Sequence, residues 1–392
     1  MARINPGISS QPPNPMFRLG ALVHGRADII HLEFGEPDFP TPAHIVEAAA
    51  RSLRDERQGY GPGNGMPWLR AEVAARAGRV NGLTVAPESV VVTTGGTGAL
   101  MASLLCLTTP GDDALVPEPA WAGYDAMLAA ANVRMIRYPL RADQGWQPDL
   151  DALEAAVTPR TSVLLINSPS NPGGAVFPRA TMERIVDLCR RKDLWLLSDE
   201  CYDELVFDGQ HVSPASLDGN DGRVLTVGTC SKSYAMTGWR VGWVIAPPAV
   251  APALALTVTA QVNNLPLFVQ RAAEAALASP PTVVREMAAA YRGRRNAAVE
   301  TLRQRSLLEY IPAGAFYLLA QIAGDDEAAL NGVAFAEALI RERSIAVAPG
   351  VAFGPATARY ARISLASDTE SVRVGLAGLL DFAATYRDRA GG

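Results

Sequence analysis

The sequence predicts an α/β protein built on a mainly parallel sheet flanked by helices, followed by a smaller α+β domain. Seven short apolar segments of strand length recur between residues 89 and 246. Several are apolar without alternation, as strands covered on both faces must be. Helical patterns separate them, and strands that alternate with helices favour a parallel sheet. After about residue 280 the pattern changes to long helices with isolated strands, which indicates a second domain.

The expected elements follow in order along the chain. The seven strands of the sheet are predicted at 89–94, 113–118, 133–140, 162–168, 194–200, 223–229 and 241–246. A helix at 181–192 is typical of the connections, because its apolar residues form one stripe. These residues are Met182, Ile185, Val186, Leu188 and Cys189. The C-terminal part is predicted to hold a helix at 282–305, a strand at 316–322, a helix at 333–343 and strands in "IAVAPG" and "YARISLA".

Composition excludes several classes of protein. The 392 residues are enough for two domains, and 48% apolar with 19% charged residues is typical of a globular chain. The net charge of −5 offers no basic stripe for nucleic acid or an anionic membrane. The proline-rich first twenty residues do not resemble a signal peptide, and no apolar run reaches the ~18 residues of a membrane helix. Four cysteines without metal or disulfide spacing favour a reducing, cytoplasmic setting and no metal site.

Polar residues stand at the carboxyl ends of predicted strands, where open α/β sheets bind ligands. Asp199 ends a strongly apolar strand, and a buried carboxylate needs a cation or several donors. It is either a turn residue or a counter-charge for a cationic ligand atom, and Tyr202 is close enough to face the same site. Asn167 and Asn171 follow another strand, either as turn formers or as amide donors to a ligand oxygen.

A glycine-rich turn joins the first strand of the sheet to a helix. Gly95, Gly96 and Thr97 form this turn. Because glycine has no Cβ, the backbone N–H groups at such a helix N-terminus can bind a phosphate. The same composition also suits an ordinary tight turn, so the motif by itself allows both interpretations.

Lysine is almost absent from the chain. Lys192 and Lys232 are the two lysines among 35 basic residues. Lys192 lies in the charged segment "CRRKDLW", where an arginine would serve equally well. Lys232 lies among small, hydroxyl and aromatic residues in "TCSKSYAMTGWRVGW". A desolvated lysine near other cations can lose its proton and attack a carbonyl, which the permanently charged guanidinium of arginine cannot do. Position 232 is therefore predicted to require an amine.

Together these motifs resemble the class I and II aminotransferases, the fold-type I enzymes of the aspartate-aminotransferase superfamily that use pyridoxal 5′-phosphate (PLP). The segment "SKSYAMTGWRVGW" is close to the lysine signature of that family. Asp-x-x-Tyr, Asn-Pro-x-Gly and a late arginine occur in the family's order and near its spacing, between about residues 29 and 368. The chain departs from the family at Gly173, where threonine is usual.

The resemblance implies a role for each residue around the cofactor ring. Lys232 is expected to hold PLP as a Schiff base and later to move the proton. Asp199 is expected to pair with the protonated pyridine nitrogen, so that the ring accepts electrons. Tyr202 and Asn171 are expected to hydrogen-bond the ring oxygen O3′, and Trp121, in "PEPAWAGY", to stack on the ring.

The resemblance also implies how the two anionic groups are bound. The residues expected to hold the cofactor phosphate are Gly95, Gly96, Thr97, Thr229, Ser231 and Arg240. Arg362, in "YARISLA", is expected to clamp the substrate α-carboxylate, with Asn171 and the backbone at Gly35 beside it. Guanidinium groups suit both anions because they bind phosphate and carboxylate in a bidentate geometry.

Domain organisation and assembly follow from the same resemblance. The expected division is a segment at 1–45 that packs with the small domain, a large PLP-binding domain with a seven-stranded sheet at 46–280, and a small domain at 281–392. Tyr60 is expected to reach the phosphate of the neighbouring subunit, which implies a homodimer with shared active sites. The peptide bonds Glu118–Pro119 and Asn171–Pro172 are expected to be cis.

The activity implied is a ping-pong transfer of an amino group from an L-amino acid to a 2-oxo acid such as 2-oxoglutarate. The helix after the phosphate turn, "ALMASLLCL", carries no basic residue for a second carboxylate. Leu265, Leu267 and Phe268 fall in a segment that helps to line substrate pockets in the family, which favours a neutral or aromatic donor. A PLP-dependent lyase, decarboxylase or cyclase is the alternative. A regulatory protein is more distant, because the pattern begins by residue 30 and leaves no room for a DNA-binding domain before it.

Overall fold

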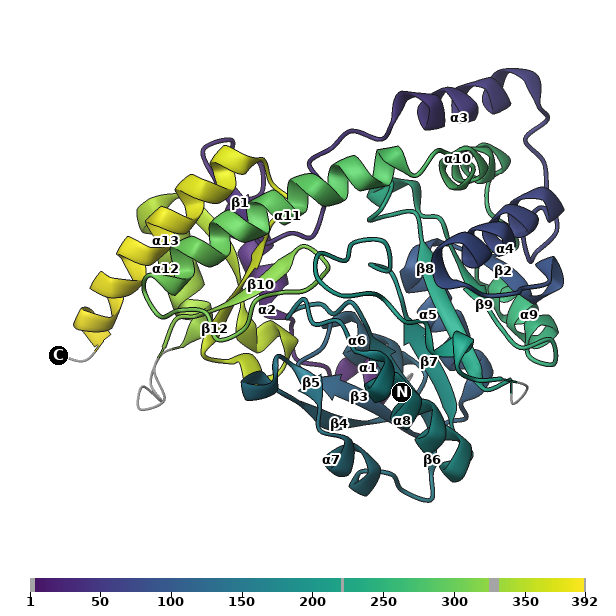
Figure 1. The fold of residues 1–392 in the computed structure, drawn as a ribbon, viewed down its shortest axis with the longest axis horizontal. Coiled ribbons are helices and arrows are strands. Elements are labelled where there is room, and N and C mark those ends of the chain that lie inside the picture. Colours follow the sequence, from purple (N-terminus) through teal and green to yellow (C-terminus); the bar gives the residue numbers. More distant parts are fainter. Residues whose placement is uncertain (1–3, 220–221, 324–330, 391–392) are drawn as a thin grey trace.

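Two sheets organise the chain in the computed structural model, which describes residues 4–219, 222–323 and 331–390 (Figure 1). The larger sheet has the strand order β2-β9-β8-β7-β6-β3-β4-β5. Its strands are β2 (Val90–Thr93), β3 (Asp113–Glu118), β4 (Arg134–Arg141), β5 (Gln147–Pro148), β6 (Thr161–Asn167), β7 (Trp195–Asp199), β8 (Val224–Thr229) and β9 (Gly242–Ile245). All seven predicted strands are present. The edge strand β5 is an eighth, and its two residues are too few to show a period in the sequence.

The larger sheet is mainly parallel, as predicted. Strands β4, β3, β6, β7 and β8 pair in parallel, and β9 lies antiparallel between β8 and β2. Every residue of β2, β3, β8 and β9 is buried. Burial on both faces explains why these segments are apolar without alternation.

Helices cover both faces of this sheet. They are α4 (Pro67–Asn81), α5 (Gly95–Leu107), α6 (Gly123–Ala130), α7 (Leu150–Ala155), α8 (Arg179–Lys192), α9 (Ala251–Val262) and α10 (Leu267–Leu277), and α3 (Ala43–Asp55) packs on α10 outside them. Consecutive residues of β7 point to opposite faces: Leu196 packs with residues of α8 and Leu197 with residues of α5. The predicted apolar stripe of α8 is its buried side. The sheet is therefore enclosed between two apolar layers, as the sequence pattern requires.

The smaller sheet joins the two ends of the chain. Its order is β1 (Ile30–Leu32), β11 (Ile345–Pro349), β12 (Tyr360–Ser364) and β10 (Tyr317–Gln321). The helices outside the large sheet are α1 (Pro6–Ser9), α2 (Pro15–Val23), α11 (Thr282–Arg303), α12 (Gly332–Arg343) and α13 (Thr369–Ala390). Strand β1 pairs in parallel with β11, so the N-terminal segment is part of the small α+β unit. The exact boundaries at residues 45 and 280 stay predictions.

The strand register places the polar strand ends next to one another. Asn167 pairs with Asp199 across β6 and β7, and Gly242 pairs with both Thr93 and Thr229. The peptide bonds before Pro119 and Pro172 are cis as expected, and the bond before Pro169 is cis as well. In the described part of the chain, no helix is long and apolar enough to cross a membrane, and no cluster of three His, Cys, Asp or Glu side chains is arranged to hold a metal ion.

Candidate active site

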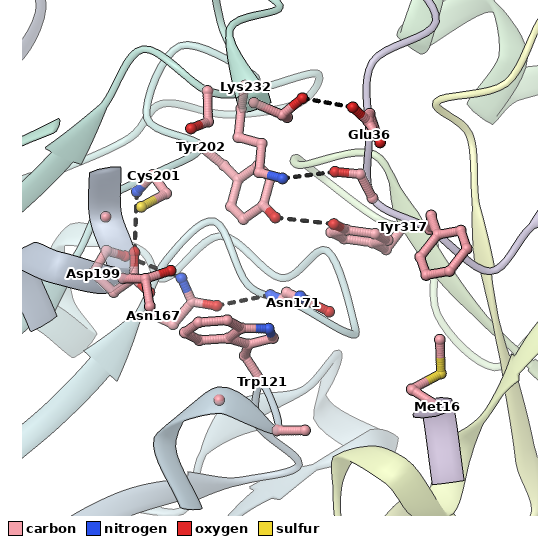
Figure 2. A pocket seen from close by; sticks show the side chains of 18 of the residues that line it. Met16, Glu36, Trp121, Asn167, Asn171, Asp199, Cys201, Tyr202, Lys232 and Tyr317 are labelled. Atoms are coloured by element: carbon pink, nitrogen blue, oxygen red, sulfur yellow. Dashed lines mark hydrogen bonds between the residues drawn. The ribbon is translucent and has the colours of Figure 1, made fainter. Parts of the chain in front are cut away.

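A cavity of about 560 Å³ lies between the carboxyl edge of the large sheet and the small unit (Figure 2). The predicted site residues that line it are Gly35, Gly96, Thr97, Trp121, Asn171, Asp199, Tyr202, Thr229, Ser231, Lys232, Arg240 and Arg362. Gly95 precedes Gly96 at the start of α5. Tyr60 does not line the cavity and is 90% exposed. Apart from Tyr60, the structure therefore brings the predicted residues together.

Lys232 follows β8 and points its amine into the cavity (Figure 2). Its Nζ donates a hydrogen bond to the backbone carbonyl of Gly35 at 2.6 Å. The amine also lies 5.9 Å from the ring centre of Tyr202. Lys192 behaves differently, because it ends α8 at the surface with its Nζ 3.5 Å from Glu154. Of the two lysines, only Lys232 is presented to a ligand.

Gly35 is required where it stands. A Cβ on Gly35 would lie 1.7 Å from the hydroxyl of Tyr317, so any other residue at this position would displace the Tyr317 ring. The Tyr317 hydroxyl is 3.0 Å from that of Tyr202, and either oxygen can donate. The absence of a side chain at Gly35 thus lets the N-terminal segment pass against both the amine of Lys232 and the tyrosine pair.

Asp199 is a buried carboxylate at the end of β7, 5% exposed. Its Oδ2 accepts a hydrogen bond from the Tyr124 hydroxyl at 2.7 Å, and its Oδ1 accepts one from the backbone N–H of Cys201 at 3.2 Å. Burial raises the pKa of Asp199 above its ordinary value, although both donors act in the opposite direction. A cationic ligand atom would favour the ionised carboxylate again, so the site is suited to a protonated ring nitrogen.

An anion-binding corner forms where α5 begins. The α5 helix has 13 residues, and its N-terminal N–H groups at Gly95 and Gly96 have no side chain in front of them. The Arg240 guanidinium lies against this turn, because a Cβ on Gly95 would be 2.8 Å from its Nη2. The backbone of Gly95 is also left-handed, with φ at 73°. The Thr229 and Ser231 hydroxyls lie 3.0 Å apart in the same corner. Helix N-terminus, hydroxyls and guanidinium together suit a phosphate.

Arg362 lies in the middle of β12 and is buried. Its Nη1 donates to Asn171 Oδ1 at 3.1 Å, and its Nη2 donates to the backbone carbonyl of Glu33. The guanidinium lies 4.4 Å from the ring centre of Tyr317 and 4.6 Å from that of Phe353. Burial lowers the pKa of Arg362, and its Nε has no hydrogen-bond partner among the described residues. A carboxylate ligand would supply the missing negative charge.

Comparison with known proteins identifies the family. The sequence model of the family described as aminotransferase class I and II matches residues 27–379. This chain belongs to that family. An arginine–pyruvate transaminase of Pseudomonas aeruginosa is 40% identical over 358 residues, 91% of this chain and 90% of that protein. An aspartate aminotransferase from Thermus thermophilus with maleate has a TM-score of 0.90 at 34% identity and covers 97% of this chain and 100% of that one. An aromatic aminotransferase from Pyrococcus horikoshii has a TM-score of 0.86 at 33% identity, over 95% and 99% of the two chains.

The cavity of this aminotransferase fits PLP, the cofactor on which its family depends. It offers the amine of Lys232, the buried carboxylate of Asp199 and an anion-binding corner, which match the aldehyde, the pyridine nitrogen and the phosphate of PLP in chemistry. Trp121 lies on one side of the cavity and Tyr202 on another (Figure 2). An aromatic side chain at Trp121 can cover a flat ring.

Several residues in or next to the cavity escaped prediction from the sequence; Tyr124 acts from outside the lining, through its hydrogen bond to Asp199. Tyr124, Tyr317, Phe353 and Glu33 come from four different elements or loops and carry no motif of their own. Tyr124 was the most accessible to prediction, since it lies three positions after Trp121. Glu33 lies two positions before Gly35, but nothing in one sequence indicates that its side chain is buried.

One expectation about the substrate pocket is corrected. Leu265, Leu267 and Phe268 do not line the cavity. Leu265 is 2% exposed and belongs to the apolar core between α3, α4 and α10, and Phe268 packs against that core. These residues are apolar because they support the helix layer. The argument from them to a neutral or aromatic donor therefore does not hold within this chain.

Proposed function

We propose that this aminotransferase moves the amino group of an L-α-amino acid to a 2-oxo acid, such as 2-oxoglutarate, in two half-reactions of a ping-pong cycle. One observation carries the proposal: a single cavity joins the amine of Lys232, the carboxylate of Asp199, and two guanidinium groups, Arg240 and Arg362. These four groups come from the segment after β8, the end of β7, the segment before β9, and β12.

The proposed roles at the cofactor end follow from the contacts. The Lys232 amine would hold PLP covalently, Asp199 would keep the pyridine nitrogen protonated, and Arg240 with the α5 N-terminus would bind the phosphate. When bound, PLP supplies a sink for the electrons of the bond broken at Cα. Once the donor amine has replaced it, Lys232 Nζ is free to take the Cα proton and return it on the cofactor side. The hydrogen bond from Nζ to Gly35 holds this amine within the cavity.

The proposed roles at the substrate end place the α-carboxylate on Arg362. The Asn171 amide, already bonded to Arg362, would orient it, and Gly35 would contribute its backbone. The remaining lining is rich in aromatic side chains: Phe17, Phe34, Trp121, Tyr317 and Phe353. This lining supports the preference for a donor whose side chain is not acidic. The names of the relatives include arginine, aspartate and aromatic-amino-acid activities, so similarity to them does not identify the amino donor of this chain.

The active unit is proposed to be a homodimer in which Tyr60 completes the partner's phosphate site. Tyr60 lies in a glycine-rich loop, and that loop contacts the end of α9, since a Cβ on Gly63 would be 2.1 Å from Thr259. Its phenol is exposed and is therefore accessible to a partner chain. The four cysteines are free thiols, which supports the proposal of a reducing, cytoplasmic location.

Amino-group transfer tests the proposal directly. The PLP-loaded enzyme would be mixed with each L-amino acid, first alone and then with pyruvate or 2-oxoglutarate. Transamination predicts loss of the cofactor's visible absorbance with the donor alone and appearance of a new amino acid only with the acceptor. Parallel double-reciprocal plots would indicate the ping-pong order. Ammonia, carbon dioxide or a cyclic product formed without an acceptor would instead support the lyase, decarboxylase or cyclase alternative.

A further inference from the structure

Glu33 is a buried carboxylate at the wall of the cavity that the proposed reaction does not use. It follows β1, its side chain is fully buried, and it lines the cavity. Its Oε1 lies 2.7 Å from His31 Nδ1. Its Oε2 has no hydrogen-bond partner among the described residues. Buried polar atoms are nearly always paired, and leaving one unpaired is costly, so this oxygen points to a missing partner.

The charges of the cavity show which partner is missing. Among the described residues that line it, the cations are Lys232, Arg240 and Arg362, and all three have assigned anions or reactive groups. Asp199 is assigned to the ring nitrogen. The unassigned charges are both negative, on Glu33 and Glu36. An acidic substrate side chain would therefore meet repulsion, whereas a cationic one would meet its complement.

The walls next to Glu33 suit an aliphatic stem. Met16, Phe17 and Phe34 line the cavity and also a second hollow of about 820 Å³ that runs along α2 past His31. Phe17 is 79% exposed and Phe34 is 49% exposed, so apolar surface is available there. A long side chain can lay its methylene groups on such a surface while its charged end reaches a carboxylate.

We propose that the preferred amino donor has a cationic side chain, an ammonium or guanidinium on an aliphatic stem, which Glu33 binds while Arg362 holds the α-carboxylate. The backbone carbonyl of Glu33 accepts a hydrogen bond from Arg362, so the two binding groups are adjacent. Burial raises the pKa of Glu33, and a ligand cation would act to lower it. This proposal rests on the proposed transamination and names its substrate class.

The test compares charged donors with uncharged analogues of similar length. The holoenzyme would be assayed with L-arginine against L-citrulline and with L-lysine against L-norleucine, and L-aspartate would serve as the acidic case. We expect at least one cationic donor to exceed its neutral analogue in kcat/KM by about 30-fold or more, since losing a buried charge partner has effects of this size. The two pairs also distinguish a guanidinium from an ammonium preference.

The Glu33→Gln variant removes the charge and keeps the shape. The ratio of kcat/KM for the preferred cationic donor to that for its neutral analogue should fall by about 30-fold in Glu33→Gln. It should stay at the wild-type value in Glu204→Gln, which neutralises a partly buried glutamate outside the cavity. Glu33→Asp should keep part of the ratio. If Glu33→Gln does not fold, calorimetry on wild-type holoenzyme can compare the binding of 5-guanidinopentanoate, which has a cationic end, with that of heptanoate, which does not. The guanidino acid should bind more tightly.

The possible outcomes separate the role of Glu33 from the proposed transamination. Equal ratios in wild type and Glu33→Gln, or equal binding of the two probe acids, would overturn the role of Glu33 while leaving transamination of neutral donors intact. Preference for aspartate would overturn it as well. Absence of amino transfer from every donor would overturn the proposed function instead.

Discussion

Asp199, at the end of β7, and Asp203, four positions later, both have side chains that are little exposed, and they face opposite surroundings. Asp199 faces the cavity and meets only neutral donors, from Tyr124 and Cys201. Asp203 faces away and meets Arg76, whose Nη1 and Nη2 donate to it at 2.9 and 2.8 Å. Burial raises the pKa of Asp199. Burial acts in the same direction on Asp203, but Arg76 outweighs it and holds the pKa of Asp203 below its ordinary value.

The charges of the cluster around Asp203 are paired with one another. Arg76 also binds Glu204 at 2.6 Å, and Glu200 pairs with His211 at 2.8 Å. The Glu200 Oε1 accepts hydrogen bonds from two serine hydroxyls, Ser198 and Ser213. The cavity differs in its charge pairing, because Asp199 and Arg362 form no ion pair among the described residues. Buried atoms without a hydrogen-bond partner occur in both places: Glu33 Oε2 and Arg362 Nε at the cavity, and Arg76 Nε and His211 Nδ1 in the cluster. One side of the segment binds its charges together for stability, and the other keeps charges available for a ligand.

The sharpest contrast should come from the lysines. Lys232→Ala should lower kcat by about 10⁴-fold or more, because both the covalent attachment and the proton transfer are lost. Lys232→Arg should be equally inactive, since a guanidinium keeps its proton. Lys192→Ala should retain wild-type activity. Steady-state kinetics would measure these effects, and borohydride reduction with peptide mapping should place the pyridoxyl label on Lys232. Label on Lys192 would refute the assignment.

The two aspartates should respond to the same substitution in opposite ways. Asp199→Asn should lower kcat by about 10²–10³-fold, because the ring nitrogen loses its counter-charge. Its PLP-free form should unfold with the same or a higher free energy, since a costly buried carboxyl is removed. Asp203→Asn should cost about 3–5 kcal/mol in the free energy of unfolding, because Arg76 loses a buried partner.

Kinetics and urea denaturation of both proteins would measure the two effects. The kcat of Asp203→Asn should stay within a small factor of wild type once the protein is folded. A large loss of stability in Asp199→Asn, combined with little loss of kcat, would invert the comparison and assign the ligand-facing role to the wrong carboxylate.

A third prediction tests whether the cavity is completed by another chain. Tyr60→Phe should weaken PLP binding by about 1.5–3 kcal/mol, the value of one hydrogen bond to a charged group. Mixed dimers of Tyr60→Phe and Lys232→Ala should contain one site with both defects and one intact site that binds PLP with wild-type affinity and is active. If every site that keeps Lys232 binds PLP weakly, Tyr60 acts within its own chain. A monomer at working concentration would also contradict the shared site.

The smallest expected effect is a pH dependence of stability that comes from His211 in the cluster around Asp203. Burial acts to lower the pKa of His211, but Glu200 and Asp203 outweigh it and raise the pKa, with Arg76 acting against them. A raised folded-state pKa stabilises the fold fully below the unfolded value of about 6.5, and this contribution is lost as the pH rises through the folded value. The free energy of unfolding should therefore fall above about pH 6.5, by about 1 kcal/mol more in wild type than in His211→Gln. Identical pH profiles for the two proteins would rule out this linkage.

Local chemistry in the sequence determined much of the fold and part of the site. The seven strands of the large sheet and the apolar stripe of α8 follow from period and burial, which are properties of neighbouring residues. Lys232 could be singled out because an amine and a guanidinium differ in chemistry wherever they lie. The phosphate-binding turn at Gly95 could be predicted because glycines at a helix N-terminus leave the backbone N–H groups open to an anion.

Only the tertiary structure decided which side of the β7 segment faces the ligand. In "SDECYDEL" the residues Asp199, Glu200, Asp203 and Glu204 are equivalent carboxylates, and their neighbours come from α4, α6 and the loop of His211. The same holds for Glu33, whose side chain is buried at the cavity wall where β1 joins β11, some three hundred residues away in the chain. The function of a charged side chain depends on the groups that fold against it. The spacing of residues along one sequence does not give the distances between these groups in space. The physical reason is that burial and Coulomb interactions depend on separation in space, whereas motif and period depend on separation along the chain.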